Sequence, residues 1–322
     1  MELVSVDIGG TNARYCLATI GDDGAISLAP PVYLATETHA SFETAWEQFT
    51  AQLGRPAPRA VALSVAAPVG GETISFTNNH WVIHPALVGE RLGVDKVTIV
   101  NDFGAVGHAV ARAAPDDFVH LAGPEEPLPA NGTLSVLGPG TGLGVAQLWR
   151  MNGDYHVQAT EGGHIDYAPL DAIEDAILAR LRQRHRRVSV ERVVSGPAIV
   201  DIYETLAALE GRAITPLSAR TIWERAEAGE DLLAVAARDR FCLSLGSAAG
   251  DFALAHGASG VVIAGGVAFK QRAAILASGF GERFRAKGRF EKLMASLPVK
   301  IIIHPEPGLL GAAAAFAKEH GQ

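Results

Sequence analysis

Two glycine-rich turns, each with a threonine, have the residue types needed to bind phosphate. One lies at residues 7–11 (Asp-Ile-Gly-Gly-Thr) and the other at residues 138–142 (Gly-Pro-Gly-Thr-Gly). Glycine lets backbone N–H groups come close to an anion, and the threonine hydroxyl adds a donor, so two such turns could hold a polyphosphate from both sides. Each turn alone is equally consistent with a plain tight hairpin. The candidate phosphate-binding residues are Gly9, Gly10, Thr11, Asn12, Gly138, Gly140 and Thr141.

Other residues extend this interpretation. Asp7 precedes the first turn and can orient a water bound to Mg²⁺, a cation that keeps several waters and takes few protein ligands. Arg14 either helps to neutralise phosphate or is an exposed strand residue. A further glycine pair, Gly265 and Gly266, follows a third apolar run and favours nucleotide binding. The sequence contains neither the P-loop pattern nor G-x-G-x-x-G, which excludes those classes of nucleotide site.

Asn101 and Asp102 follow an apolar run, at the kind of strand end where ligands bind in α/β proteins. Asp102 can act as a general base that removes a proton from a substrate hydroxyl. One carboxylate is enough for phosphoryl transfer, because catalysis there rests mainly on positioning and on neutralising charge. Taken alone, Asp102 is better explained as the cap of a helix that begins at Phe103.

A second polar group lies around two adjacent glycines. Glu161 and His164 flank those glycines, in a loop able to aim both side chains at one small ligand with hydroxyl groups. Glu191, near a predicted helix start, can add another carboxylate. The alternatives are a satisfied interior histidine for His164 and an exposed helical residue for Glu191. Residues 78–81 (Asn-Asn-His-Trp) either wall a sugar pocket or form a hairpin turn.

Two hairpins are predicted, each turning at one of the glycine motifs. Their strands cover residues 3–8, 13–20, 133–137 and 143–149. This repetition of strand, Gly-Thr turn and strand suggests two related lobes that face a cleft. Residues 171–256 are expected to be mostly helical, and the Pro/Gly-rich stretch 123–132 to be a surface connector. Further strands are expected at 60–66, 97–100, 155–159, 260–264 and 299–304, and further helices at 41–53 with Ser41 as N-cap, 84–93, 103–113 and from 308 onward.

Composition limits the class of protein. A chain of 322 residues is long for one core, and 48% hydrophobic with 19% charged residues indicates folded lobes. No apolar run approaches the roughly 18 residues of a membrane helix. A net charge of −8 argues against nucleic-acid binding. Only two cysteines, Cys16 and Cys242, and the absence of a signal-peptide pattern indicate free thiols in a cytoplasmic protein.

Seven motifs, taken in order, resemble the bacterial glucokinase family. They are Asp-Ile-Gly-Gly-Thr-Asn-Ala-Arg (7–14), Thr-Asn-Asn-His-Trp (77–81), Asn-Asp-Phe-Gly-Ala-Val (101–106), Leu-Gly-Pro-Gly-Thr-Gly-Leu-Gly (137–144), Glu-Gly-Gly-His (161–164), Glu-Arg-Val-Val-Ser-Gly-Pro (191–197) and Ala-Gly-Gly-Val (264–267). Each motif alone is weakly specific, but together they span nearly the whole chain and are highly specific.

The resemblance implies an α/β, two-domain actin-like ATPase (ribonuclease H-like) fold with a cleft between the domains. The smaller domain would hold residues 1–115 and 305–322, and the larger would hold residues 116–304. The implied reaction transfers the γ-phosphoryl group of ATP to the 6-hydroxyl of glucose, with Mg²⁺, in a homodimer. Asp102 would be the base, the two turns would hold the phosphates, and Gly265 with Gly266 would lie near the adenosine. The implied sugar contacts are Asn101, Asp102, Glu161, His164 and Glu191.

Two other functions stay open. One is a kinase of the same fold that acts on mannose, fructose or an amino sugar; the other is a non-catalytic nucleotide-binding protein, either a filament protein or a sugar sensor. Asp102 distinguishes the non-catalytic protein from the kinases, because a protein that only binds its ligands does not need a general base. The neighbouring repressor/kinase group fits less well, since many of its members carry a cysteine-rich zinc motif that this sequence lacks.

Overall fold

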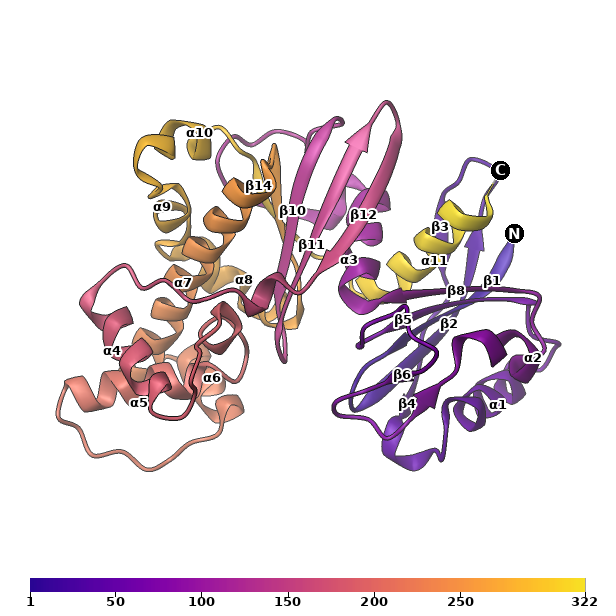
Figure 1. The fold of residues 1–322 in the computed structure, drawn as a ribbon, viewed down its shortest axis with the longest axis horizontal. Helices are drawn as coiled ribbons and strands as arrows, with labels where there is room; N and C mark the ends of the chain where they lie inside the picture. Colours follow the sequence, from indigo (N-terminus) through magenta and orange to yellow (C-terminus); the bar gives the residue numbers. More distant parts are fainter. Residues whose placement is uncertain (322) are drawn as a thin grey trace. The chain divides into compact units, whose positions relative to one another are not determined.

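Two six-stranded sheets organise residues 1–321, the part of the chain that the computed structural model describes (Figure 1). Contacts group the chain into two units. The first unit contains Met1–Ala114, Val157–Ala159 and the residues from His304 onward, and the second contains Pro115–His156 and Thr160–Ile303. The mixed strands and helices confirm the predicted α/β class.

The sheet of the first unit has the strand order β3-β2-β1-β5-β8, with β4 also paired to β2. Its strands are β1 (Glu2–Ile8), β2 (Asn12–Ile20), β3 (Ile26–Leu28), β4 (Val32–Ala35), β5 (Ala60–Val65) and β8 (Lys96–Asn101). β1 and β2 are antiparallel, whereas β5 runs parallel to both β1 and β8. Every residue of β5 is buried, as expected for a parallel strand covered on both faces. A separate hairpin joins β6 (Ile74–Ser75) to β7 (Val82–Ile83).

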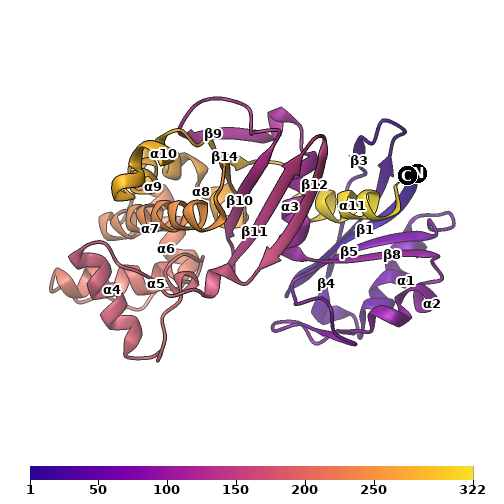
Figure 2. The ribbon, with the colours of Figure 1, turned by 45° about the horizontal axis from the view of Figure 1, so that its top comes forward.

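Four helices belong to the first unit: α1 (Phe42–Gln52), α2 (Val88–Leu92), α3 (Asp102–Arg112) and α11 (Pro307–His320). The predicted N-cap of α1 is confirmed, because the Ser41 hydroxyl accepts the Thr44 N–H. The C-terminal helix α11 lies beside the N-terminal strands in both ribbon views (Figures 1 and 2). It also packs closely on α3: a Cβ at Gly311 would lie 1.7 Å from the carbonyl oxygen of Ala105, so this crossing requires glycine.

The sheet of the second unit has the order β12-β11-β10-β13-β14-β9. Its strands are β9 (Phe118–Ala122), β10 (Gly132–Pro139), β11 (Leu143–Met151), β12 (Asp154–Thr160), β13 (Gly260–Ile263) and β14 (Val299–Ile302). Its hairpin and parallel pairs repeat the pattern of the first sheet, with β10 antiparallel to β11 and parallel to β13, and β13 parallel to β14. The predicted repetition of two strand–turn–strand units is therefore confirmed. β9, which pairs antiparallel with β14, was not predicted.

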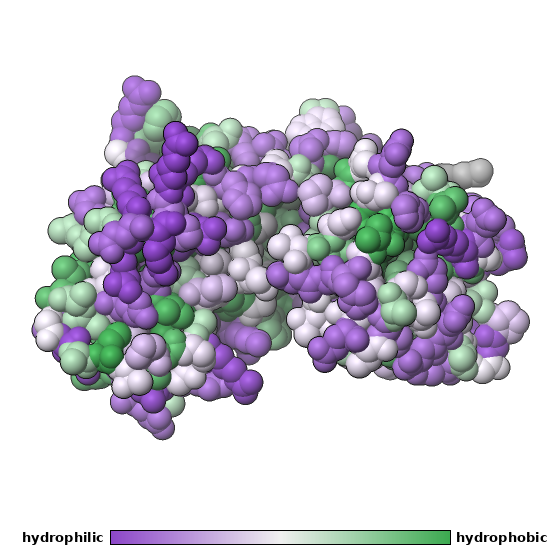
Figure 3. Space-filling view, turned by 60° about the horizontal axis from the view of Figure 1, so that its bottom comes forward, coloured by the Kyte–Doolittle hydropathy of each residue, from purple (hydrophilic) through white to green (hydrophobic). Residues whose placement is uncertain are grey.

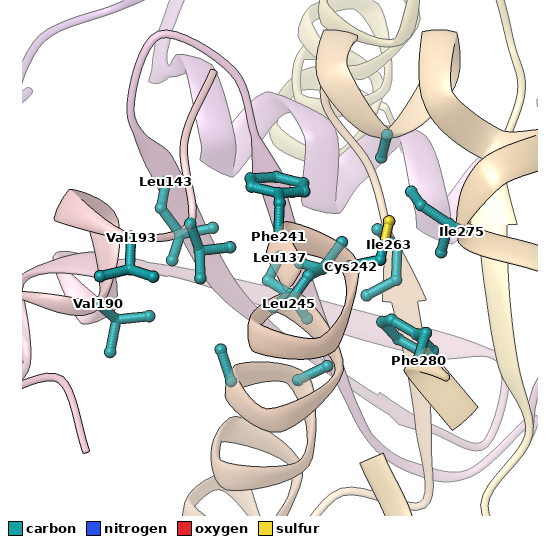
Figure 4. Close-up of a cluster of buried hydrophobic side chains, with 14 of the residues drawn as sticks. Leu137, Leu143, Val190, Val193, Phe241, Cys242, Leu245, Ile263, Ile275 and Phe280 are labelled. Atoms are coloured by element: carbon teal, nitrogen blue, oxygen red, sulfur yellow. The ribbon is translucent and has the colours of Figure 1, made fainter. Parts of the chain in front are cut away.

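The helices of the second unit are α4 (Ala172–Arg182), α5 (Ile199–Leu209), α6 (Ala219–Ala228), α7 (Leu232–His256), α8 (Gly266–Ala277), α9 (Phe280–Arg285) and α10 (Glu291–Ala295). The 25-residue α7 runs through the core of this unit. Figure 4 shows the Cys242 sulfur of α7 among apolar side chains that include Ile263 and Phe280.

Both cysteines are buried free thiols, as the sequence indicated. Burial raises the pKa of the Cys16 thiol and of the Cys242 thiol to about 12, so neither is a reactive thiolate at neutral pH. On the face shown in Figure 3, hydrophilic side chains cover most of each unit, with hydrophobic residues in separate groups. Within residues 1–321, no helix has the length and apolarity needed to cross a membrane.

Candidate functional site

The carbonyl groups of the first glycine turn point into the protein and are all hydrogen-bonded. The Gly9 oxygen accepts from Asn79 Nδ2 at 3.4 Å, and the Gly10 oxygen accepts from Thr36 Oγ1 at 2.9 Å. The Thr11 oxygen accepts the Thr36 N–H, also at 2.9 Å. Neither Thr36 nor Asn79 was among the candidate phosphate-binding residues.

The N–H groups of the same turn are directed differently. Gly9 donates to the Asn12 oxygen at 3.0 Å, which closes the turn. The N–H groups of Gly10 and Thr11 have no acceptor among residues 1–321, and the Thr11 side chain is exposed. Two unpaired N–H donors and a hydroxyl on one exposed turn form the arrangement that binds an anion.

A pocket of about 450 Å³ lies beside this turn. It is lined by Gly10, Thr11, Thr36, Glu37, Thr77, Asn78, Asn79 and His80. Of residues 78–81, only Trp81 is absent from this lining, because it is 1% exposed and packs in the core, with its ring 6.2 Å from that of Phe42. Asn78, Asn79 and His80 do line this pocket, as the first interpretation of residues 78–81 expected, and they also lie in the loop of the β6–β7 hairpin, which was the alternative.

Asp7 is the next-to-last residue of β1, and both of its carboxylate oxygens are hydrogen-bonded. Oδ1 accepts from Ser64 Oγ and Oδ2 accepts from Arg14 Nη1, each at 2.8 Å. Gly308, in the first turn of α11, lies so close that a Cβ there would come within 2.6 Å of the Asp7 carboxyl carbon. The carboxylate therefore lies at the positive end of α11, where negative charge is stabilised. Arg14 is an ion-pair partner of Asp7, with a side chain that is 42% exposed.

The second glycine turn repeats the features of the first. The Gly140 N–H donates to the Gly142 oxygen at 2.8 Å, and the Gly140 oxygen accepts the Gly196 N–H at 2.8 Å. Within the described part of the chain, the N–H groups of Thr141 and Gly142 have no acceptor, and the Thr141 side chain is exposed. This turn therefore also presents two N–H donors and a hydroxyl.

The glycine pair after β13 lies directly beside the second turn. A Cβ at Gly138 would be 2.7 Å from the Ala264 carbonyl carbon, and a Cβ at Gly265 would be 2.6 Å from the Pro139 oxygen. Gly265 has φ 86° and ψ 154°, a conformation that is essentially restricted to glycine. It is followed by Gly266, the first residue of the 12-residue α8, whose N-terminal N–H groups can also bind an anion.

Asn101 and Asp102 lie where β8 meets α3. Asn101, not Asp102, is the N-cap of α3: its Oδ1 accepts the N–H groups of Phe103 at 3.0 Å and Gly104 at 3.1 Å. The interpretation of Asp102 as the cap is therefore wrong, although its Oδ1 does accept the Phe103 N–H at 2.8 Å. Asn101 Nδ2 donates to the Ala67 oxygen at 3.3 Å, which leaves one amide hydrogen for a ligand.

Glu161 precedes the short 3₁₀ helix Gly162–His164, and His164 is its last residue. Their side chains are 74% and 57% exposed, with His164 Nε2 3.9 Å from Glu161 Oε2. The alternative of an interior histidine is therefore wrong. A Cβ at Gly163 would lie 2.2 Å from the Leu143 oxygen, so glycine lets this loop pack onto the start of β11.

Glu191 is half-buried in the 3₁₀ helix Val190–Arg192, and its side chain packs against the second turn. Its Oε2 accepts the Leu143 N–H at 2.9 Å, and a Cβ at Gly142 would lie 2.4 Å from that oxygen. The alternative of an exposed helical residue is wrong. The loop that carries Glu161 and His164 therefore packs against Leu143, the first residue of β11, and Glu191 binds the N–H of the same residue.

Comparisons with known proteins give one consistent family. The glucokinase family model matches residues 4–319. A glucokinase of Zymomonas mobilis is 53% identical over 322 residues, covering 100% of this chain and 99% of the relative. A glucokinase of Caulobacter vibrioides is 40% identical over 317 residues, covering 97% of this chain and 94% of the relative.

Solved structures agree with the sequence relatives. The crystal structure of a glucokinase from an Antarctic psychrotroph superposes with a TM-score of 0.87 at 32% identity, covering 98% of this chain and 99% of that one. A ROK-family glucokinase from Streptomyces griseus, solved with glucose and AMPPNP, has a TM-score of 0.65 at 20% identity, covering 97% and 98%. The second likeness shows the shared two-domain actin-like ATPase fold.

Proposed function

The chain belongs to the glucokinase family, and we propose that Asp102 is the base in the reaction it catalyses, transfer of the γ-phosphoryl group of ATP to the 6-hydroxyl of glucose. Asp102 takes the hydroxyl proton while the sugar oxygen bonds to phosphorus and the bond from phosphorus to the ADP oxygen breaks. The products are glucose 6-phosphate and ADP. From the family we also propose a cytoplasmic homodimer of two-domain chains, divided into residues 1–115 with 305–322 and residues 116–304.

The observation that carries the nucleotide assignment is the match between the two turns. Each turn holds two consecutive N–H groups outward, with no protein acceptor within residues 1–321, beside an exposed threonine. The donors assigned to the phosphates are the N–H groups of Gly10, Thr11, Thr141 and Gly142 and the two threonine hydroxyls. Gly265 and Gly266 lie beside the second turn, which supports their assignment to the adenosine side of the nucleotide.

Mg²⁺ fits the residues present when its main ligands are phosphates and waters. Within the described residues, no group of three or more His, Cys, Asp or Glu side chains is placed to hold a metal. Each Asp7 oxygen accepts one protein hydrogen bond and keeps a lone pair for a metal-bound water. Asp7 is therefore the residue we assign to Mg²⁺, which when bound neutralises charge on the transferred phosphoryl group.

The sugar is assigned to side chains that retain hydrogen-bonding capacity. Asn101 keeps one amide hydrogen, and Glu161 and His164 are exposed. Glu191 uses Oε2 for the Leu143 N–H, while its Oε1 has no donor among residues 1–321. A set of two carboxylates, an imidazole and an amide suits the hydroxyl groups of a hexose.

Glu191→Gln should raise the KM for glucose by about tenfold. The substitution keeps the shape but removes the charge, and a hydrogen bond to a charged acceptor is worth about 1.4 kcal/mol more than a neutral one, which is about tenfold in KM. Steady-state kinetics would measure the effect, with Glu227→Gln on the exposed face of α6 as the control that leaves KM unchanged. An unchanged KM for glucose in the Glu191 variant would remove this residue from the sugar site.

A coupled assay of the purified protein with Mg-ATP and glucose, mannose, fructose or N-acetylglucosamine tests the substrate. We expect kcat/KM to be highest for glucose, because a site built to bond each hydroxyl discriminates strongly against a sugar that leaves one unpaired. Faster turnover of another sugar would keep the mechanism and overturn the substrate. Binding of sugar and ATP without turnover would favour the non-catalytic alternative.

A further inference from the structure

Thr36 donates two hydrogen bonds to the first glycine turn, one from its hydroxyl and one from its backbone N–H. It begins the 3₁₀ helix Thr36–Thr38 and is only 3% exposed. Its hydroxyl donates to the Gly10 oxygen and its N–H donates to the Thr11 oxygen, each at 2.9 Å. Buried polar groups are expected to be paired, but here both donors are paired with consecutive carbonyls of one functional turn.

These bonds fix the direction of the N–H groups that face outward. In a trans peptide the C=O of one residue and the N–H of the next point in opposite directions within one plane. Holding the Gly10 oxygen inward therefore holds the Thr11 N–H outward. Asn79 acts likewise on the preceding peptide, since its bond to the Gly9 oxygen holds the Gly10 N–H outward.

The turn needs these hydrogen bonds from Thr36 and Asn79 because its glycines leave the backbone flexible. Gly9 and Gly10 can rotate their peptide planes at little steric cost, and a flipped peptide would present a carbonyl oxygen where a phosphate must bind. From this geometry we infer that Thr36 is a positioning residue for the ATP phosphates, acting through the Gly10–Thr11 peptide. The inference rests on the proposed role of this turn in binding ATP.

Thr36→Val tests the inference, because valine keeps the shape and the backbone N–H bond but removes the hydroxyl. We expect the KM for ATP to rise about three- to tenfold, in line with the loss of one neutral hydrogen bond. The KM for glucose should stay within about twofold. Thr36→Ser should restore the wild-type KM for ATP. Thr38→Val is the matched control, since Thr38 lies in the same 3₁₀ helix and its hydroxyl donates to the Ala35 oxygen at 2.9 Å instead.

The outcomes separate the positioning role from the proposed function of the turn. Thr11→Val removes a hydroxyl assigned to phosphate and should itself raise the KM for ATP. If it does so while Thr36→Val, with an unchanged melting temperature, leaves that KM at the wild-type value, the positioning role is wrong and the phosphate site stands. If neither variant changes the KM for ATP, the phosphate site is wrong. An equal rise of both KM values in Thr36→Val, or the same effect in Thr38→Val, would indicate general destabilisation and would overturn the inference.

Discussion

Asp102→Asn is expected to lower kcat by about 10²- to 10⁴-fold, the range typical for loss of a general base. Asparagine has the same shape but cannot take the proton of the sugar hydroxyl. The start of α3 should survive, because Asn101 is the cap of that helix. Calorimetric titration should therefore show glucose binding within about tenfold of wild type, and rapid-quench assays should show the loss in the chemical step.

A matched control for this variant is Asp175→Asn. Asp175 is also an acidic residue in the first turn of a helix, α4, but it is exposed and has no assigned role. It should lose only the modest stabilisation of a carboxylate at a helix N-terminus, about 0.3–1 kcal/mol, with kcat unchanged. If Asp102→Asn kept kcat within tenfold of wild type, Asp102 would not be the base. If the wild type turns over and Asp102→Asn binds sugar and ATP tightly without turnover, the non-catalytic alternative is excluded.

The parts of the site that could be predicted depend on local sequence. The glycine turns were predictable because a strand, a Gly-Thr turn and a second strand occur within a few residues, and the register confirms both hairpins. The buried strand β5 was predictable because its apolar run is continuous. The helix start at Ser41 was predictable because a capping hydroxyl precedes an amphipathic run.

The rest depended on contacts between distant residues. Thr36 and Asn79 bind the first turn from 26 and 70 residues away, and the sequence around them does not indicate that they hold its carbonyl groups. Asn101 and Asp102 are both good N-cap residues, so the choice between them was decided by tertiary structure: Asn101 ends β8 and also bonds to Ala67. The strand β9 was missed because its five residues, Phe-Val-His-Leu-Ala, show no alternation of apolar and polar side chains, and its partner β14 is distant in the sequence.

Gly265→Ala is expected to raise the KM for ATP by more than tenfold and to lower the melting temperature. Two costs combine at this position. The φ of 86° and ψ of 154° are available essentially only to glycine, so alanine adds about 1–3 kcal/mol of backbone strain. The new Cβ would also lie 2.6 Å from the Pro139 oxygen and 2.9 Å from the Gly138 carbonyl carbon. Both contacts are backbone atoms, so the second phosphate turn or the start of α8 must move.

Gly211→Ala separates the two costs, because Gly211 has φ 64° but a Cβ there would meet nothing within 4 Å. This control should show a loss of about 1–2 kcal/mol in the free energy of unfolding from the left-handed backbone, with the KM for ATP unchanged. The rise in the KM for ATP in Gly265→Ala, beyond any change in Gly211→Ala, then reports the displacement of the second turn. Since Gly265 contacts the second turn, which is assigned to the phosphates, the KM for glucose should change much less than the KM for ATP. Equal changes in the two KM values would show that Gly265 supports the fold of its unit and has no specific role in nucleotide binding.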